Sequence, residues 1–289
     1  MQHRPVILVI LDGWGAREGG EDNAPLIAET PNFDRIRATC PTALLDASGE
    51  DVGLPAGQIG NSEVGHTNIG AGRVVWMDLP RIDRAIEDGS FDANPALAEF
   101  ADRLLETGGT AHLVGLASPG GVHAHQCHIA AAARVLSARG VPVALHLLTD
   151  GRDVGPETAR GQVAALLGEL DGLAGLRVAS VIGRFYAMDR DKRWERVSAA
   201  WEAIAQGRGR VAPDALAAID AAYARGETDE FIEPTVLGAA GAMAPGDGVF
   251  CLNFRADRAR EILEELRRRS AEPQRPEMEL DYFDRLLEK

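Results

Sequence analysis

Hydrophobic residues along most of the chain form short continuous runs that alternate with stretches of helical spacing. Continuous apolar runs are typical of strands buried on both faces of a parallel sheet. Between them, apolar residues recur with the 3.6-residue period of amphipathic helices. The pattern predicts strands near 111–117, 142–148, 176–182 and 248–254, and helices near 94–107, 126–139, 157–170, 191–206 and 256–269.

This alternation predicts an α/β fold with a mostly parallel sheet flanked by helices. The apolar run from Pro5 to Leu11 predicts one further buried parallel strand near the start. The first 76 residues offer too few strands to close a core alone, so we expect them to pack less well. We therefore predict two domains, residues 1–76 and 77–289, the second ending in a weakly structured tail.

Composition narrows the class of protein. The 289 residues, 45% of them hydrophobic, suffice for a substantial core. A net charge of -14 without basic runs argues against nucleic acid or an anionic membrane as partner. No run resembles a signal peptide or membrane helix, which favours a cytoplasmic protein. The cysteines, Cys40, Cys127 and Cys251, are odd in number and widely spaced, which favours reduced packing residues over disulfides or zinc ligands.

The glycine-punctuated stretch from Gly60 to Arg73 holds a single serine, Ser62, and lacks a regular hydrophobic period, which predicts a loop. Glycines let backbone N–H groups approach an anion, and Ser62 can act as a nucleophile if a base or metal helps to ionise it. Asp12 follows the first predicted strand, where it could hold a hard metal ion beside the serine. His66 is expected to orient the loop. An ordinary surface loop and a turn aspartate are the alternatives.

Polar residues follow each of the four later strands. If the sheet is parallel, these loops leave it at one edge and their arginines converge. Planar guanidinium groups suit phosphate and carboxylate, although each arginine taken alone could be a solvated surface residue. His123 follows two glycines, so it could transfer a proton or contact a phosphate. The converging arginines are Arg152, Arg184, Arg190, Arg255 and Arg258.

The remaining histidines suggest less chemistry. His123, His125 and His128 together invite a metal interpretation. The following helix is expected to turn His128 away, and no cysteine has zinc-site spacing, so we predict no metal there. His112 and His146 fall in predicted strands and are interpreted as packing residues.

Six motifs, taken together and in this order, resemble the cofactor-independent phosphoglycerate mutases. The resemblance implies an alkaline-phosphatase-like domain with two manganese ions and a transiently phosphorylated serine, and an inserted phosphotransferase domain that holds the glycerate. The match runs from about residue 5 to 265. The motifs are DGWG from Asp12, NSEVGH from Asn61, SPGGVH from Ser118, TDGRD from Thr149, GRFYAMDRD from Gly183 and NFRADR from Asn253.

The same resemblance implies an activity and a set of site residues. The activity is the interconversion of 3-phosphoglycerate and 2-phosphoglycerate in glycolysis and gluconeogenesis, without bisphosphoglycerate. The full-length family is expected to be monomeric. Carried over by motif, Ser62 looks like the phosphoryl acceptor and, with Asp12, a manganese ligand. The substrate-binding set looks like His123, Arg152, Asp153, Arg184, Arg190, Arg255 and Arg258.

The chain resembles only the N-terminal part of that family. No histidine follows His146, and the family's later metal-binding motifs have no counterpart. Asp12 and Ser62 alone are too few ligands for two divalent ions, so we predict weak metal binding and little mutase activity unless a C-terminal half complements the chain. The alternatives are a metal-dependent phosphatase, another phosphomutase, and a noncatalytic phosphoglycerate-binding fragment or subunit. The arginine-lined pocket favours a mutase over a hydrolase.

Overall fold

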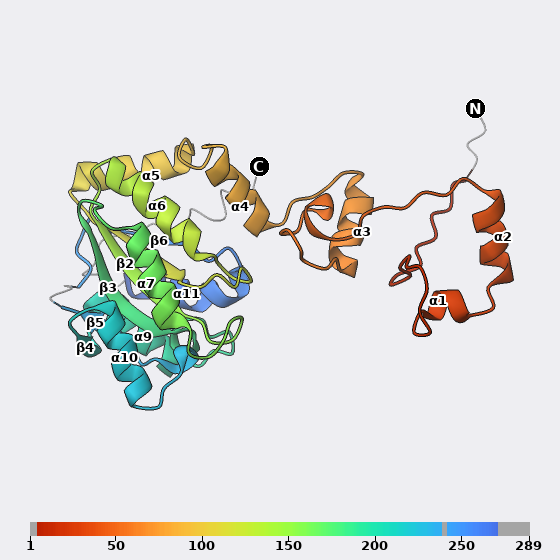
Figure 1. Cartoon of the computed structure of the whole chain (residues 1–289). Helices are drawn as coiled ribbons and strands as arrows, with labels where there is room; N and C mark the ends of the chain where they lie inside the picture. The colour runs from red at the N-terminus through yellow and green to blue at the C-terminus, as the bar shows by residue number, and fades with distance from the viewer. Residues whose placement is uncertain (1–4, 239–241, 271–289) are drawn as a thin grey trace. The chain divides into compact units, whose positions relative to one another are not determined.

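The computed structural model describes residues 5–238 and 242–270, and the chain divides into two compact units (Figure 1). The first unit ends at Pro80 and the second begins at Arg81. This division lies near the predicted one, whose domain assignments stay predictions. The tail expected to be weakly structured lies outside the described residues.

Within the described residues, the second unit contains a six-stranded sheet in the order β4-β5-β3-β2-β1-β6. The central strand β1 pairs in parallel with β2 and β6, and β2 pairs in parallel with β3. Strand β5 runs antiparallel to β3 and parallel to β4. The strands are β1 (Ala111–Leu116), β2 (Val143–Thr149), β3 (Leu176–Gly183), β4 (Arg210–Ala212), β5 (Thr235–Leu237) and β6 (Gly248–Cys251).

Helices cover both faces of this sheet, and the strands alternate their side chains between two cores. Leu113 and Leu145 face one core, and Val114 and Leu148 face the other. The first core is completed by α4 (Asp78–Glu87), α5 (Pro95–Thr107), α6 (Gln126–Ala138), α7 (Ala159–Glu169) and α10 (Ala215–Ala224). The second is completed by α8 (Arg184–Ala187), α9 (Trp194–Gln206) and α11 (Ala256–Ser270).

The predicted α/β class with a mostly parallel sheet is confirmed. All four strands predicted after residue 94 form, as do the five predicted helices, with ends shifted by a few residues. The prediction omitted β4, β5, α4, α8 and α10. None of the described helices is both long and apolar enough to cross a lipid bilayer.

The first unit differs more from expectation. Its described residues form α1 (Ala24–Ile27), α2 (Pro31–Thr39), the 3-10 helix η1 (Gly49–Val52) and α3 (Ser62–Ala71). Its buried apolar cluster consists of Val52, Leu54 and Val64, a far smaller core than those of the second unit.

Two predictions about the first unit are wrong. Residues 5–11 form no strand, because no other described segment of this unit pairs with them by backbone hydrogen bonds. Their side chains are not buried either, and Val6 is 94% exposed. The stretch after Gly60 is a helix instead of a loop. Asn61 Oδ1 accepts a hydrogen bond from the Val64 N–H at 3.0 Å and caps the helix start, and Gly72, at φ 64°, ends it.

Candidate active site

Four loops of the second unit leave the sheet at one edge, because β1, β2, β3 and β6 are parallel neighbours. His123 lies in the loop after β1, and Arg152 follows β2. Arg184 begins α8 directly after β3, and Arg255 follows β6. The structure therefore brings these sequence-predicted residues to one edge of the sheet.

Arg184 is the buried centre of this edge. Its Nη1 donates to Asp150 Oδ1 at 2.5 Å and to Asp153 Oδ2 at 2.7 Å, and Asp150 is fully buried. Burial alone raises the pKa of Asp150, but hydrogen bonds from Ser118 Oγ, the Asp153 N–H and Arg184 lower it overall. Asp150 is therefore a buried carboxylate that fixes Arg184. The sequence reasoning did not select Asp150 or Ser118, although both lie inside recognised motifs.

A short helix supports the two loops that carry these residues. The 3-10 helix η2 (Asp229–Phe231) lies so close that a Cβ at Gly151 would meet Glu230 N at 2.8 Å. A Cβ at Gly183 would lie 2.4 Å from Glu230 O. Gly151 also has φ +71°, so only glycine fits there without strain. These two glycines let η2 support the loops directly.

His123 is a neutral imidazole at this edge. Its Nε2 lies 3.7 Å from Asp153 Oδ2. Burial and the neighbouring Arg184 lower its pKa to about 4, against the opposing effect of Asp153. Its buried Nδ1 has no hydrogen-bond partner among the described residues. At neutral pH the ring can therefore donate from one nitrogen and accept at the other.

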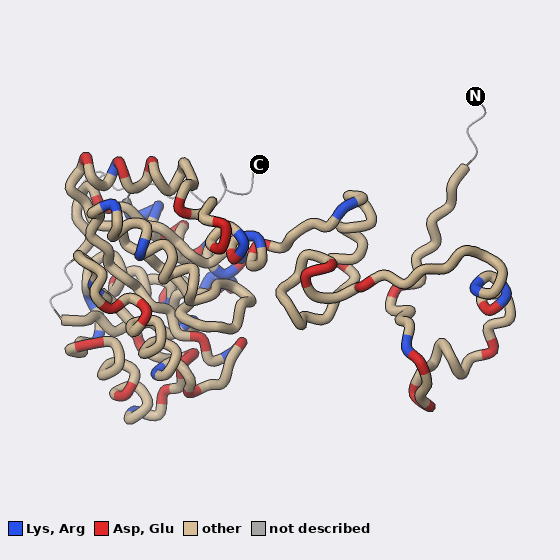
Figure 2. The backbone as a smooth tube through the Cα atoms, turned by 45° about the horizontal axis from the view of Figure 1, so that its top comes forward, with Lys and Arg blue, Asp and Glu red and all other residues tan. Residues whose placement is uncertain are grey.

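The outer arginines are half-exposed and paired with carboxylates. Arg190 Nη1 lies 3.3 Å from Asp257 Oδ2, and Arg255 Nε lies 3.0 Å from Asp257 Oδ1. Arg152 Nε lies 3.7 Å from Glu230 Oε1. Figure 2 shows the same interspersion of acidic and basic residues across the second unit. An incoming anion would compete with these carboxylates for the arginines.

Arg258 has a different environment. Its Nη1 donates to the Met188 carbonyl at 3.1 Å, and its buried Nε has no partner among the described residues. Burial lowers the pKa of Arg258, and Arg190, Arg184 and Arg152 lower it further. Their influence shows that these four cations share one neighbourhood. A group of cations in one neighbourhood favours the binding of an anion.

The serine predicted to accept a phosphoryl group lies in the first unit. Ser62 Oγ donates to Asp12 Oδ2 at 2.8 Å and lies 3.2 Å from His66 Nδ1. His66 Nδ1 also lies 2.8 Å from the Ser62 carbonyl oxygen, one turn earlier in α3. The two adjacent oxygens of Asp12 and Ser62 suit a hard divalent cation such as manganese.

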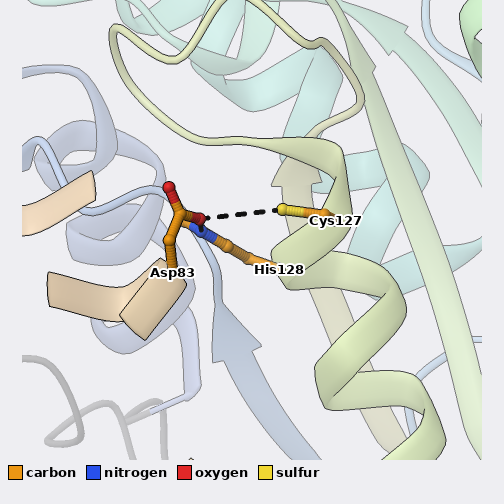
Figure 3. A group of neighbouring side chains, drawn as sticks. All are labelled: Asp83, Cys127 and His128. Carbon is orange, nitrogen blue, oxygen red and sulfur yellow. Dashed lines mark hydrogen bonds and ion pairs between the residues drawn. The ribbon is translucent and has the colours of Figure 1, made fainter. Parts of the chain in front are cut away.

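A second cluster was missed by the sequence reasoning. His128 Nε2 lies 2.8 Å from Asp83 Oδ1, and Cys127 Sγ lies 3.9 Å from the same oxygen (Figure 3). Burial and, next, Asp83 raise the pKa of Cys127 to about 12. The sequence interpretation predicted no metal at these histidines and did not consider Asp83, because Asp83 lies on α4, a helix that was not predicted.

His112 and His146 also do more than pack. His112 Nε2 lies 3.1 Å from Asp247 Oδ2, and His112 Nδ1 lies 2.9 Å from His146 Nε2. His146 Nδ1 lies 2.8 Å from Ser180 Oγ. Burial lowers the pKa of both histidines. The four residues form a hydrogen-bonded chain that crosses three neighbouring strands.

Comparison with known proteins places these sites in context. The family profile described as "BPG-independent PGAM N-terminus" matches residues 82–284. Relatives named 2,3-bisphosphoglycerate-independent phosphoglycerate mutase include one from Dinoroseobacter shibae, 62% identical over 260 residues, and one from Paracoccus denitrificans, 60% identical over 260 residues. Each alignment covers 90% of this chain and 51% of the relative, so the chain spans about half the length of the curated relatives it matches.

A solved structure is also similar. The phosphoglycerate mutase of Leishmania mexicana, determined at low cobalt concentration, superposes with a TM-score of 0.70 and 29% sequence identity. The superposition covers 93% of this chain and 53% of that protein. The similarity in structure thus extends over nearly the whole chain.

Proposed function

Since the chain belongs to the family of BPG-independent phosphoglycerate mutases, we propose that it provides the phosphoryl-accepting serine and the substrate pocket for interconverting 3-phosphoglycerate and 2-phosphoglycerate. The observation that carries this proposal is the gathering of arginines around the buried Arg184–Asp150 pair at the carboxyl edge of the sheet. The substrate carries both a carboxylate and a phosphate, and such an edge offers cations to each.

The pocket residues divide this work. Arg184 is fixed by Asp150 and Asp153, so it presents a rigid cation at low entropic cost. Arg258 has no carboxylate within ion-pair distance among the described residues, which leaves its charge available to an anion. Neutral His123 can donate a hydrogen bond to a phosphate or hydroxyl oxygen. Together these groups would retain the glycerate while its phosphate is transferred, as a mutase requires and a hydrolase does not.

Ser62 would receive the phosphoryl group on Oγ and lose its proton. The hydroxyl already donates to Asp12 Oδ2, and His66 Nδ1 lies 3.2 Å from the hydroxyl oxygen, Ser62 Oγ. A manganese ion held by Asp12 and Ser62 would lower the hydroxyl pKa and neutralise phosphate charge. The proton released by Ser62 goes to the glycerate oxygen that lost the phosphoryl group. The phosphoryl group then passes from Ser62 Oγ to the other hydroxyl of the retained glycerate, and the proton of that hydroxyl returns to Ser62, so the substrate is isomerised without net hydrolysis.

The finer attributes belong to this proposal as well. We propose manganese as the ion, a place in glycolysis and gluconeogenesis, a cytoplasmic location, and a complementing C-terminal half that adds metal ligands. A second candidate function is phosphoglycerate binding without turnover. This candidate is favoured by the small number of predicted manganese ligands. In the described part of the first unit these ligands are Asp12 and Ser62, which are few for holding two catalytic ions.

The proposal is tested by assaying the chain for conversion of 3-phosphoglycerate to 2-phosphoglycerate with manganese and without bisphosphoglycerate, with the product coupled to enolase. Ser62→Ala should abolish turnover. Ser48→Ala, an exposed serine without a side-chain capping bond, should not change it. Turnover that survives Ser62→Ala would contradict the serine assignment.

Calorimetric titration with 3-phosphoglycerate separates binding from chemistry. Arg255→Ala should weaken binding at least about tenfold, because a charged hydrogen bond contributes roughly 1.5–3 kcal/mol. The matched control is Arg208→Ala, an exposed arginine away from this edge. Binding without turnover would support the second candidate, and absence of both would refute the pocket.

A further inference from the structure

We propose that Asp83, Cys127 and His128 form a binding site for one zinc-like divalent ion, which fastens α4 to the first turn of α6 (Figure 3). The site lies wholly within the second unit and shares no residue with the pocket or with Ser62. It is therefore independent of the proposed function.

The three donor atoms already lie close together. His128 Nε2 and Asp83 Oδ1 are 2.8 Å apart, and Cys127 Sγ is 3.9 Å from the same oxygen. All three donor atoms lie within 4.8 Å of one another. Around a tetrahedral zinc ion, bond lengths of about 2.0–2.3 Å put such atoms roughly 3.4–3.6 Å apart. Ångström-scale adjustments of side chains would therefore complete the coordination.

The donor types select the kind of ion. Thiolate, imidazole and carboxylate are ligands of zinc and cobalt, whereas magnesium and calcium take oxygen alone. The Asp83 side chain is 38% exposed, so water can reach a fourth position. The hydrogen between His128 Nε2 and Asp83 Oδ1 would have to leave Nε2 on metal binding, and the buried Nδ1 of the same ring, which has no partner among the described residues, can take it up.

Cys127 has a neighbour that suits a ligand. Its Sγ lies 2.8 Å from His125 Nδ1, a nitrogen that accepts a hydrogen bond from the Cys127 N–H, while the thiol proton can be donated to Asp83 Oδ1 at 3.9 Å. On metal binding this proton would leave to solvent, and the dipositive charge would stabilise the thiolate. His125 would then act as a positioning residue beside the sulfur.

The ion would link two helices that both contribute to the first core and already share the hydrogen bond between Asp83 and His128. Ile82 and Ile86 of α4 pack against the first core, and Asp83 lies between them on the same helix. Cys127 and His128 begin α6, just after the loop that carries His123. Bound metal would therefore restrain both α4 and the start of α6.

Cobalt titration tests the site directly. Purified chain is titrated with Co²⁺ while the near-ultraviolet sulfur-to-cobalt charge-transfer band is followed, which reports thiolate coordination and is silent for ions held by oxygen alone. We expect one equivalent to produce the band and Zn²⁺, but not Mg²⁺, to displace it. Cys127→Ser should abolish the band. Cys40→Ser, a matched change at an exposed cysteine, should leave it intact.

Asp83→Asn provides a second variant, since its partly exposed side chain makes misfolding a poor explanation of any loss. Asp83→Asn should weaken Co²⁺ binding by more than about tenfold. A loss of roughly tenfold could also arise if Asp83 only supported a ligand without touching the metal. Zn²⁺ should also raise the thermal midpoint of the Cys40→Ser chain but not of the Cys127→Ser chain. No band, a band that survives Cys127→Ser, or equal affinity in Asp83→Asn would overturn the site.

Discussion

Replacing Arg184 with methionine tests whether the buried pair at the strand edge holds this region together. The change removes the guanidinium and keeps an unbranched apolar stem of similar length. Asp150 then loses its cation at a position that is fully buried in the folded chain. The variant therefore isolates the cost of an uncompensated buried carboxylate.

The structure sets the expected magnitude. Removing one partner of a buried ion pair typically costs about 3–5 kcal/mol. Asp150 keeps three hydrogen bonds, from Ser118 Oγ at 2.7 Å and from the N–H groups of Arg152 and Asp153 at 3.2 and 3.1 Å. These donors offset part of the loss, so we expect a decrease of about 3 kcal/mol in the free energy of unfolding, near the lower end of that range.

Urea unfolding followed by tryptophan fluorescence measures this loss. Arg160→Met is the matched control, because Arg160 Nε pairs with Asp220 at 2.7 Å while both side chains are about half exposed. Exposed pairs contribute about 0–1 kcal/mol. Adding Asp150→Asn to Arg184→Met should recover part of the stability, because the double variant no longer has an unpaired charge at the fully buried position 150. A loss in Arg184→Met no larger than in Arg160→Met would refute this account of the edge.

Three further predictions follow from the same geometry. Gly151→Ala should lower the free energy of unfolding, measured in urea, by more than the about 1–2 kcal/mol that a left-handed alanine costs, because its Cβ would also clash with Glu230. Gly172→Ala is the control, because Gly172 has φ +77° and open space around it, so only the backbone penalty should appear. Stability should fall as pH drops from 6.5 towards 4, because unfolded His123 takes up a proton that the folded ring does not bind until its pKa of about 4. His123→Gln should remove on the order of 1–3 kcal/mol of that fall in a pH series of unfolding curves, and an unchanged slope would contradict the buried neutral ring. Asp229→Ala should cost about 1–2 kcal/mol, because two N–H groups at the start of α7 lose their acceptor, and Asp214→Ala at an exposed cap should cost less in thermal unfolding.

The sheet and its main helices were predictable because the parallel strands are buried on both faces. Burial on both sides makes the sequences of β1 and β2 apolar except at His112, His146 and Thr149, so the signal does not depend on which face each residue occupies. Strands β4 and β5 were missed because each has three residues, too few for a period to show. Helix α10 was missed because its residues are mostly alanine, which gives little contrast between faces.

The first unit shows where local pattern fails. Residues 6–11 have the composition of a buried strand, but a strand needs a neighbour, and the described part of this unit supplies none. Ser62 begins a helix in spite of the unfavourable helix propensity of Gly65 and Gly70, and Asn61 caps its start by accepting the hydrogen bond of the Val64 N–H group. A capping asparagine directly before the serine was the available signal for a helix.

For the candidate site, sequence reasoning could place the cations at one edge but could not assign their partners. Parallel strand ends require the loops to meet, whatever their side chains do. Which carboxylate neutralises which arginine depends on sub-ångström placement of loops, so the pairing of Arg190 and Arg255 with one aspartate, Asp257, has no signature in the sequence. The pairing changes the functional argument. Among the described residues Arg258 alone of the five arginines has no carboxylate within ion-pair distance, so an incoming anion should bind there first and then draw the paired arginines away from their carboxylates.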